Sequence, residues 1–248
     1  MSLITCTNTK TSWSAARTWK WLDETILPVA NELATTGFFA CLPAALISTA
    51  VDRLAGTGIG VGAQDAWYEP GDNTGETPAT LLAELGCTHV MLGHTDRRAR
   101  GEDDDLVARK AAAVHASGMT PLICVGEPEK TDTHTATEHT LTQVRACTAG
   151  LPDDAGAYVM YEPGWTVGSA AAEPAHVAAV FDGVRTGLAD RPSEVALFYG
   201  GGVVAGTYRA LRSAGAKPDG LGLGRVVKEA NLLREVLDEI ATSPEFDG

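Results

Sequence analysis

Three side chains whose types suit proton transfer stand just beyond short apolar runs of the chain. Glu162 directly follows one run, and His94 and Lys10 stand two and four residues beyond two others. A carboxylate can remove a proton next to a carbonyl group, a neutral imidazole can polarise the carbonyl oxygen, and an ammonium can stabilise the enediolate that forms. If these residues meet, they predict an acid–base site for a carbonyl compound.

Glycines stand at the ends of the last two apolar runs. Gly201 and Gly202 follow one run and Gly224 follows the other. Glycine lets backbone amides approach an anion closely, and a helix that begins after such a loop adds the positive end of its dipole. These positions therefore predict a phosphate-binding site beside the acid–base groups.

Short apolar runs alternate with segments of helical periodicity along the whole chain. The runs are 3–6, 38–42, 59–61, 89–92, 122–125, 158–161, 195–199 and 221–223, and the clearest helical segments are 15–33, 78–85, 106–117 and 229–240. Strands that are apolar on both faces and separated by helices are typical of parallel strands covered by helices. Eight such units predict an α/β fold, a (β/α)8 barrel, with 1–248 as a single domain. Its active site would form at the carboxyl ends of the strands, where the polar residues stand.

Composition and charge exclude several other classes of protein. The formal net charge of −13 disfavours binding to nucleic acid or to an anionic membrane, because both need clustered Lys and Arg. No run approaches the roughly 18 apolar residues of a membrane span, and the N-terminus lacks the features of a signal peptide. The five cysteines are widely spread without a CxxC pair, so we expect reduced core residues, no zinc site and a cytoplasmic protein.

Six motifs, in order, resemble those of the triosephosphate isomerase family, and the similarity runs almost from end to end. They are Asn8-Thr9-Lys10, Asn73-Thr74-Gly75-Glu76, Leu92-Gly93-His94-Thr95-Asp96-Arg97-Arg98, Cys124-Val125-Gly126-Glu127, Tyr161-Glu162-Pro163-Gly164-Trp165-Thr166-Val167-Gly168 and Tyr199-Gly200-Gly201. The resemblance implies an isomerase of glycolysis and gluconeogenesis that interconverts dihydroxyacetone phosphate and glyceraldehyde 3-phosphate. It also implies that neither a cofactor nor a metal takes part.

The resemblance assigns roles to the matching residues. Glu162 is the base, His94 the neutral electrophile and Lys10 the electrostatic stabiliser. Asn8 supports Lys10 and the substrate. A lid that begins after Glu162 closes over the site and excludes water. Taken one by one, Glu162 could also cap a turn, His94 could be a core histidine and Lys10 an exposed lysine.

Phosphate and partner contacts follow from the same resemblance. The phosphate would be held by Gly168 on the lid, by the strand-end glycines and by Arg225. The loop around Thr74 implies a homodimer. Supporting roles fall to Asp96, Glu127 and Trp165, of which we expect Glu127 to be mainly structural.

The charged residues near His94 have a simpler interpretation. We expect Thr95 to cap the following helix, and Asp96, Arg97 and Arg98 to form a supporting ion-pair network. The charge run 102–105 is typical of a solvated helix start.

Four positions depart from the family pattern. Gly202 replaces a serine, Arg225 a glycine, Gly164 a hinge valine and Asp96 a glutamate. Arg225 adds a fork of donors suited to phosphate, and Gly164 should make closure of the lid entropically costlier.

The departures leave two alternatives open. They resemble paralogues whose last strand ends in Leu-Gly-Arg and which isomerise erythrulose phosphates, so a tetrulose phosphate is an alternative substrate. A catalytically silent barrel with a binding role is a second alternative, which the intact set Asn8, Lys10, His94 and Glu162 disfavours.

Overall fold

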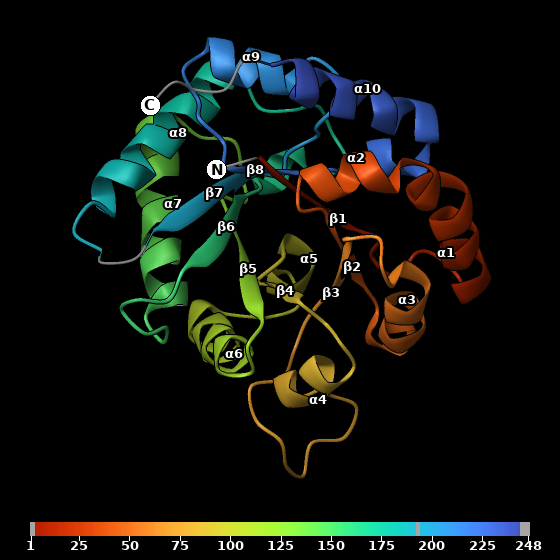
Figure 1. The fold of residues 1–248 in the computed structure, drawn as a ribbon. Coiled ribbons are helices and arrows are strands. Elements are labelled where there is room, and N and C mark those ends of the chain that lie inside the picture. Colours follow the sequence, from red (N-terminus) through yellow and green to blue (C-terminus); the bar gives the residue numbers. More distant parts are fainter. Residues whose placement is uncertain (1–2, 192–193, 244–248) are drawn as a thin grey trace.

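A computed structural model describes residues 3–191 and 194–243, and within them eight parallel strands close into a barrel (Figure 1). Each strand pairs with its neighbours along the chain, and the barrel closes where Ile4 of the first strand pairs with Gly220 of the last. The closed barrel confirms the predicted fold class. The strands are β1 (Ile4–Asn8), β2 (Phe39–Leu42), β3 (Gly60–Ala63), β4 (His89–Leu92), β5 (Thr120–Val125), β6 (Ala157–Tyr161), β7 (Val195–Tyr199) and β8 (Gly220–Gly222).

Helices surround the strands, and the loop before α4 projects away from the barrel (Figure 1). The predicted helices over 78–85, 106–117 and 229–240 are confirmed to within two residues at each end. The α-helices are α1 (Ala15–Trp21), α2 (Ala30–Thr35), α3 (Ile47–Leu54), α4 (Ala79–Glu84), α5 (Thr95–Arg98), α6 (Asp104–Ala116), α7 (Thr133–Thr148), α8 (Pro174–Gly187), α9 (Thr207–Ser213) and α10 (Ala230–Thr242). Short turns of other helical types are η1 (Leu22–Ile26), η2 (Leu27–Val29), η3 (Ala44–Leu46), η4 (Gly164–Thr166) and η5 (Val226–Lys228).

The segment 15–33 is not the single helix that its periodicity predicts. Between α1 and α2 the chain passes through a π-helical turn, η1, and a 3-10 turn, η2. Pro28 lacks a backbone N–H and cannot continue a regular helix. The preceding residue adapts, since the Leu27 N–H bonds five residues back to the Leu22 carbonyl. The prediction missed this break because the apolar spacing continues across it.

The apolar core lies in two layers. The smaller layer fills the barrel interior, and the larger one lies between the strands and the helices. Glycines in β8 make room for the interior layer, because a Cβ on Gly220 would stand 2.5 Å from the ring of Phe198. The last strand is therefore poor in strand-forming residues for a packing reason. All five cysteines are buried and free, as the sequence predicts for reduced core residues.

No helix within residues 3–191 and 194–243 has both the length and the apolar character that crossing a bilayer requires.

Candidate active site

The carboxyl ends of the strands bring the four predicted catalytic residues to one small cavity. Asn8 and Lys10 come from β1, His94 from β4 and Glu162 from β6, and all four line a cavity of about 60 Å³. Gly224, beyond β8, lines it as well. Residues more than 150 positions apart therefore meet because the strands are parallel and end on the same face of the barrel.

Glu162 is a buried carboxylate with little to stabilise its charge. Its Oε2 lies 3.3 Å from Nε2 of His94 without forming a hydrogen bond, and it has no hydrogen-bond partner among the described residues. Burial raises the pKa of Glu162 to about 7, an effect that the charge of Lys10 opposes and that of Asp96 reinforces. A carboxylate that is costly to ionise is a stronger base, which suits proton abstraction near neutral pH.

The His94 ring caps helix α5 and is thereby fixed in one protonation state. Its Nδ1 accepts a hydrogen bond of 3.0 Å from the Asp96 backbone N–H. A neutral imidazole that accepts at Nδ1 carries its proton on Nε2, the nitrogen that faces Glu162. Burial, followed by the charge of Lys10, lowers the pKa of His94 to about 4. The predicted cap by Thr95 is wrong, because the His94 ring fills that position.

Lys10 has a backbone conformation that few residues adopt. Its φ of 52° is the one positive φ outside glycine among the residues that the structure describes. Such a conformation costs about 1 kcal/mol. Two hydrogen bonds hold it: the Lys10 N–H donates to Oδ1 of Asn8 at 2.8 Å, and the Lys10 carbonyl accepts from Nε2 of Gln64 at 2.8 Å. The supporting role of Asn8 toward Lys10 thus has a specific contact behind it.

The ammonium of Lys10 pairs with Asp96. The distance from Nζ to Oδ2 is 2.9 Å, and both side chains are more than 40% exposed. Burial opposes ionisation of Asp96, but the hydrogen bond from Lys10 and the nearby positive charges leave its pKa lowered. Asp96 therefore holds the ammonium beside the cavity.

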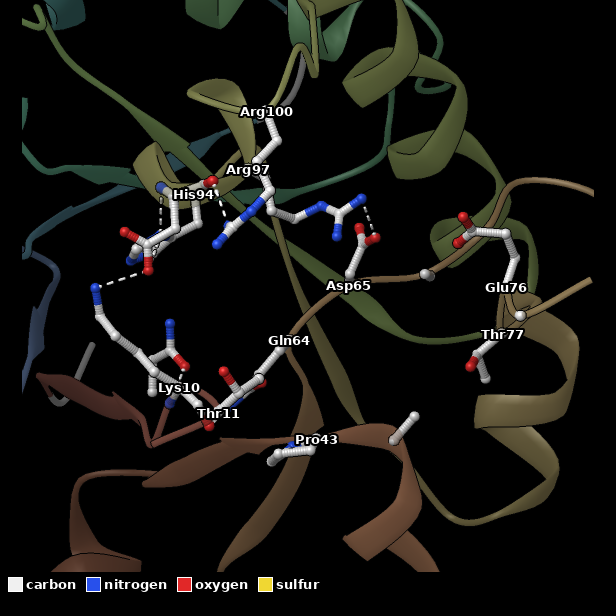
Figure 2. A pocket seen from close by; sticks show the side chains of 15 residues that line it. Lys10, Thr11, Pro43, Gln64, Asp65, Glu76, Thr77, His94, Arg97 and Arg100 are labelled. Atoms are coloured by element: carbon white, nitrogen blue, oxygen red, sulfur yellow. Dashed lines mark hydrogen bonds and ion pairs between the residues drawn. The ribbon is translucent and has the colours of Figure 1, made fainter. Parts of the chain in front are cut away.

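Arg97 and Arg98 pair with partners other than Asp96. Arg97 binds Oδ2 of Asp65 at 2.7 Å, as Figure 2 shows, and Arg98 binds Oδ1 of Asp104 at 2.6 Å. Each of the three predicted residues is therefore ion-paired, but with partners on other elements and not with one another. Arg98 also donates to the Gly93 carbonyl, next to His94. These contacts tie the short helix α5 to the loop after β3 and to α6.

The prediction that the charge run 102–105 is solvated is wrong for its first residue. Asp103 does cap α6, accepting from the Leu106 N–H. Glu102, in contrast, is buried and bonds to Arg97 and to Lys110, which is fully buried. Lys110 also bonds to Asp65 at 2.8 Å. The run marks the start of a buried ion network as well as of a helix.

The segment predicted to form the lid begins at Pro163 and runs to an apex at residues 169–172. Glu127 anchors its base. The Trp165 Nε1–H donates to Glu127 at 2.8 Å, and the Tyr161 hydroxyl donates to the same carboxylate at 3.1 Å. Glu127 therefore holds the last residue of β6 and the first turn of the lid together. Trp165 and Glu127, to which the resemblance assigns supporting roles, therefore contact each other directly.

Gly164 serves close packing in the described conformation rather than hinge freedom. A Cβ at this position would stand 3.0 Å from Cα of Pro128, and the Gly164 N–H bonds to the Glu127 carbonyl at 2.8 Å. Its φ lies outside the left-handed region. The expectation based on conformational entropy alone missed this contact.

The lid apex lies against the loops that follow β7 and β8. The Ala172 N–H donates to the Tyr199 hydroxyl at 2.8 Å, and Arg225 donates to the Ser169 carbonyl at 2.8 Å. Gly202 has a φ of +68°, and a Cβ there would stand 2.9 Å from the Ala171 nitrogen. Gly202 thus has both a conformational and a steric reason to lack a side chain.

The remaining glycines of the predicted phosphate site differ in their surroundings. A Cβ on Gly201 would collide with the Tyr199 hydroxyl at 2.6 Å, whereas Gly168, with a φ of +75°, and Gly224 have nothing within 4 Å of that position. Of the residues predicted to bind phosphate (Gly168, Gly201, Gly202, Gly224 and Arg225), Gly224 alone lines the small cavity in the described part of the chain.

A second, larger cavity of about 460 Å³ opens beside Lys10 and His94 (Figure 2). Gln64, Asp65 and Arg97 line it on the barrel side, and Glu76 and Thr77 on the side of the loop before α4. Thr74, at the tip of that loop, is exposed.

Sequence reasoning did not assign roles to Gln64, Tyr199 or Lys110. Gln64 directly follows β3, where site residues are expected in a barrel. No sequence pattern, however, shows that its amide bonds to the Lys10 backbone. Tyr199 belongs to a matched motif, although its bond to the lid depends on a fold-level contact. Lys110 lies mid-helix, where a lysine normally indicates an exposed face.

The fold and the site define a (β/α)8 barrel whose mouth holds a buried carboxylate, a neutral imidazole and an ammonium. Comparisons with known proteins agree: the family model "Triosephosphate isomerase" matches residues 3–240. The triosephosphate isomerase of Thermus thermophilus is 36% identical over 212 residues, covering 81% of this chain and 83% of that protein. That of Pseudomonas aeruginosa is 37% identical over 212 residues, covering 80% and 81%.

A solved structure gives the same result. The crystal structure of triosephosphate isomerase from Bartonella henselae matches with a TM-score of 0.81 and 28% identity, covering 98% of this chain and all of that one. The chain belongs to the triosephosphate isomerase family.

Proposed function

We propose that this protein interconverts dihydroxyacetone phosphate and glyceraldehyde 3-phosphate through an enediolate. The observation that carries the proposal is the pairing of Glu162 Oε2 with Nε2 of His94 at 3.3 Å in a cavity that Lys10 also lines. At this spacing, the base can reach the carbon next to the carbonyl group of a small substrate while the electrophile reaches the carbonyl oxygen.

Each step uses a group already in place. Glu162 removes a proton from the carbon next to the carbonyl, while the Nε2–H of His94 donates to the carbonyl oxygen. Lys10 offsets the negative charge of the enediolate. The proton of the first carbon's hydroxyl passes to the former carbonyl oxygen by way of Nε2 of His94. Protonated Glu162 returns its proton to the neighbouring carbon, so that the ketose becomes the aldose. The electrons stay within the substrate, and the step needs no cofactor.

The substrate phosphate would be bound by backbone N–H groups at Gly168, Gly201, Gly202 and Gly224. Three of these glycines lie in loops that the lid contacts or that line the cavity, and Gly168 lies in the lid itself. Closing the lid over the phosphate would therefore bring the amides of separate segments to one anion.

The triose substrate accounts for the departures better than a tetrulose phosphate does. Gly202 and Arg225 contact the lid backbone, and Gly164 packs on Pro128. None of these contacts enlarges the cavity for a further carbon. A silent barrel would not explain why Glu162 is buried without a hydrogen-bond partner for Oε2, which is an arrangement that costs folding free energy.

We also propose a soluble cytoplasmic homodimer that binds neither nucleic acid nor membranes. The net charge of −13 supports the last point. The exposed loop around Thr74 and the open cavity of about 460 Å³ support the dimer, because one copy could offer the loop and the other the cavity. In a two-fold dimer each loop would fill the other subunit's cavity.

Steady-state kinetics test the substrate assignment directly. We expect kcat/KM for glyceraldehyde 3-phosphate to exceed that for erythrulose 4-phosphate by orders of magnitude, and Glu162→Gln to lower turnover on the triose about a thousandfold or more. A preference for the tetrulose phosphate would overturn the substrate assignment. Near-normal turnover of Glu162→Gln would show that Glu162 is not the base.

A further inference from the structure

Arg225 donates from its guanidinium to the main chain of the lid. The Nη2 atom lies 2.8 Å from the Ser169 carbonyl oxygen, and the two residues are 56 positions apart in the chain. Arg225 itself is exposed, in the turn that follows Gly224. The contact therefore connects the loop after β8 to the lid at the rim of the site.

The lid apex can make few contacts of its own. Residues 169–172 are one serine and three alanines. None of their side chains hydrogen-bonds to another described residue. Among the described residues, the hydrogen bonds between the apex and the barrel come from barrel side chains that bind the lid backbone.

Two barrel side chains do so, on either side of the apex. Arg225 binds the Ser169 carbonyl, and the Tyr199 hydroxyl accepts from the Ala172 N–H at 2.8 Å. Between these bonds the Ala171 nitrogen lies close to Gly202. The apex is thus fixed at both ends and packed in the middle.

We propose that Arg225 is a positioning residue that holds the lid shut over the substrate, by binding the Ser169 carbonyl from the loop after β8. It acts on the lid backbone and leaves the phosphate to the glycine amides. One exposed hydrogen bond from a charged donor is strong enough to favour the closed lid and weak enough to break at each turnover. The sequence-based prediction that Arg225 binds the substrate phosphate is the alternative that the test must distinguish.

Hydrogen exchange in the protein without substrate or phosphate distinguishes the two roles. The Ala172 amide, which Arg225 does not touch, exchanges only when the lid opens. For Arg225→Met, which keeps the length of the stem but cannot donate, we expect exchange of this amide to be about three- to tenfold faster. Tyr199→Phe removes the acceptor of the Ala172 N–H and should accelerate its exchange at least as much. Arg225→Lys should restore part of the protection.

Lys228→Met is the matched control. Lys228 is exposed in the same turn, so its loss removes the same charge without a bond to the lid. Exchange at Ala172 should be unchanged in this variant. Equal exchange in wild type and Arg225→Met would overturn the proposal, as would an equal acceleration in Lys228→Met.

Catalysis supplies a second measurement, which depends on the proposed function. When the lid opens early, the enediolate can expel its phosphate: its electron pair forms a new C=C bond as the C–O bond to phosphate breaks. The products are inorganic phosphate and the enol of methylglyoxal, and no oxidant is needed. We expect more methylglyoxal per turnover from Arg225→Met. If only inhibition by inorganic phosphate weakens, while exchange at Ala172 and the methylglyoxal yield stay the same, Arg225 is a phosphate ligand. The exchange measurement does not depend on isomerase activity, so the two proposals fail separately.

Discussion

At the scale of the residue, the burial of Glu162 sets the pH at which the site can work. Its pKa of about 7 means that the base is protonated and inactive below that pH, whereas His94, with a pKa of about 4, stays neutral throughout the range. We therefore expect kcat/KM to rise with pH up to about 7 and then to level off. The pH profile with glyceraldehyde 3-phosphate tests this, and an acid limb near pH 4.5 would contradict it.

The same shift makes a prediction about stability. A carboxyl group whose pKa rises on folding contributes stability that is complete below its unfolded value, here 4.5, and is lost as pH rises through about 7. The shift corresponds to about 3 kcal/mol. Glu162→Gln removes the buried charge, so its free energy of unfolding should exceed that of wild type by a margin that grows between pH 5 and pH 8.5.

Urea denaturation across that pH range measures the margin. Glu138→Gln, at an exposed position on α7, is the control and should show no such growth. If the difference in free energy of unfolding between Glu162→Gln and wild type stayed constant with pH, the charge of Glu162 would not destabilise the fold. The prediction thus connects the group proposed as the base to a cost in the fold.

At the scale of the element, the buried network around Lys110 joins the loop after β3 to α5 and α6. Its ammonium has no exposed surface and bonds to Asp65 and to Glu102. Lys110→Met leaves both carboxylates short of a partner, so we expect a loss of about 3–5 kcal/mol in the free energy of unfolding. Lys20→Met, which removes an exposed lysine on α1, should cost less than about 1 kcal/mol.

A double variant shows whether the loss comes from unpaired charge. Without Lys110, Asp65 and Glu102 share Arg97 as their remaining partner. Adding Glu102→Gln to Lys110→Met removes one of these two carboxylates, so the double variant should be more stable than the sum of the single losses allows. Strict additivity by urea denaturation would contradict the network.

The elements were predictable from the sequence to different degrees, for physical reasons. Strands buried on both faces have a continuous apolar pattern, which is why all eight were found. Pro28 interrupted 15–33 without disturbing its apolar spacing. Glu102 and Asp103 are neighbours with similar side chains, yet only the fold decides that one meets Lys110 while the other caps α6.

The residues of the site could also be predicted only in part. Glu162, His94 and Lys10 could be predicted from their places after apolar runs, because the carboxyl ends of all barrel strands meet on one face. The sequence could not show that the Arg225 guanidinium binds a lid carbonyl, because the direction of the side chain depends on how two loops pack. Nor could it show that Gly164 lies on Pro128.

At the scale of the whole molecule, the site of a lone subunit is open on one side. The cavity of about 460 Å³ borders Lys10 and Asp96, whose side chains are 41% and 44% exposed. If a second copy fills it with the loop around Thr74, water is excluded from the ammonium and the strained Lys10 backbone is held more firmly. Activity should then depend on assembly.

Thr74→Arg tests that dependence, because a bulky charge at the loop tip would disfavour insertion into a cavity that already holds Arg97 and Arg100. We expect a shift toward monomer in sedimentation velocity and a fall in kcat/KM of about tenfold or more, which should be largest at low protein concentration. Asp182→Arg, on α8 away from the loop before α4, should change neither quantity (Figure 1). A fully active monomer would separate catalysis from assembly and leave the open cavity without a role in the reaction.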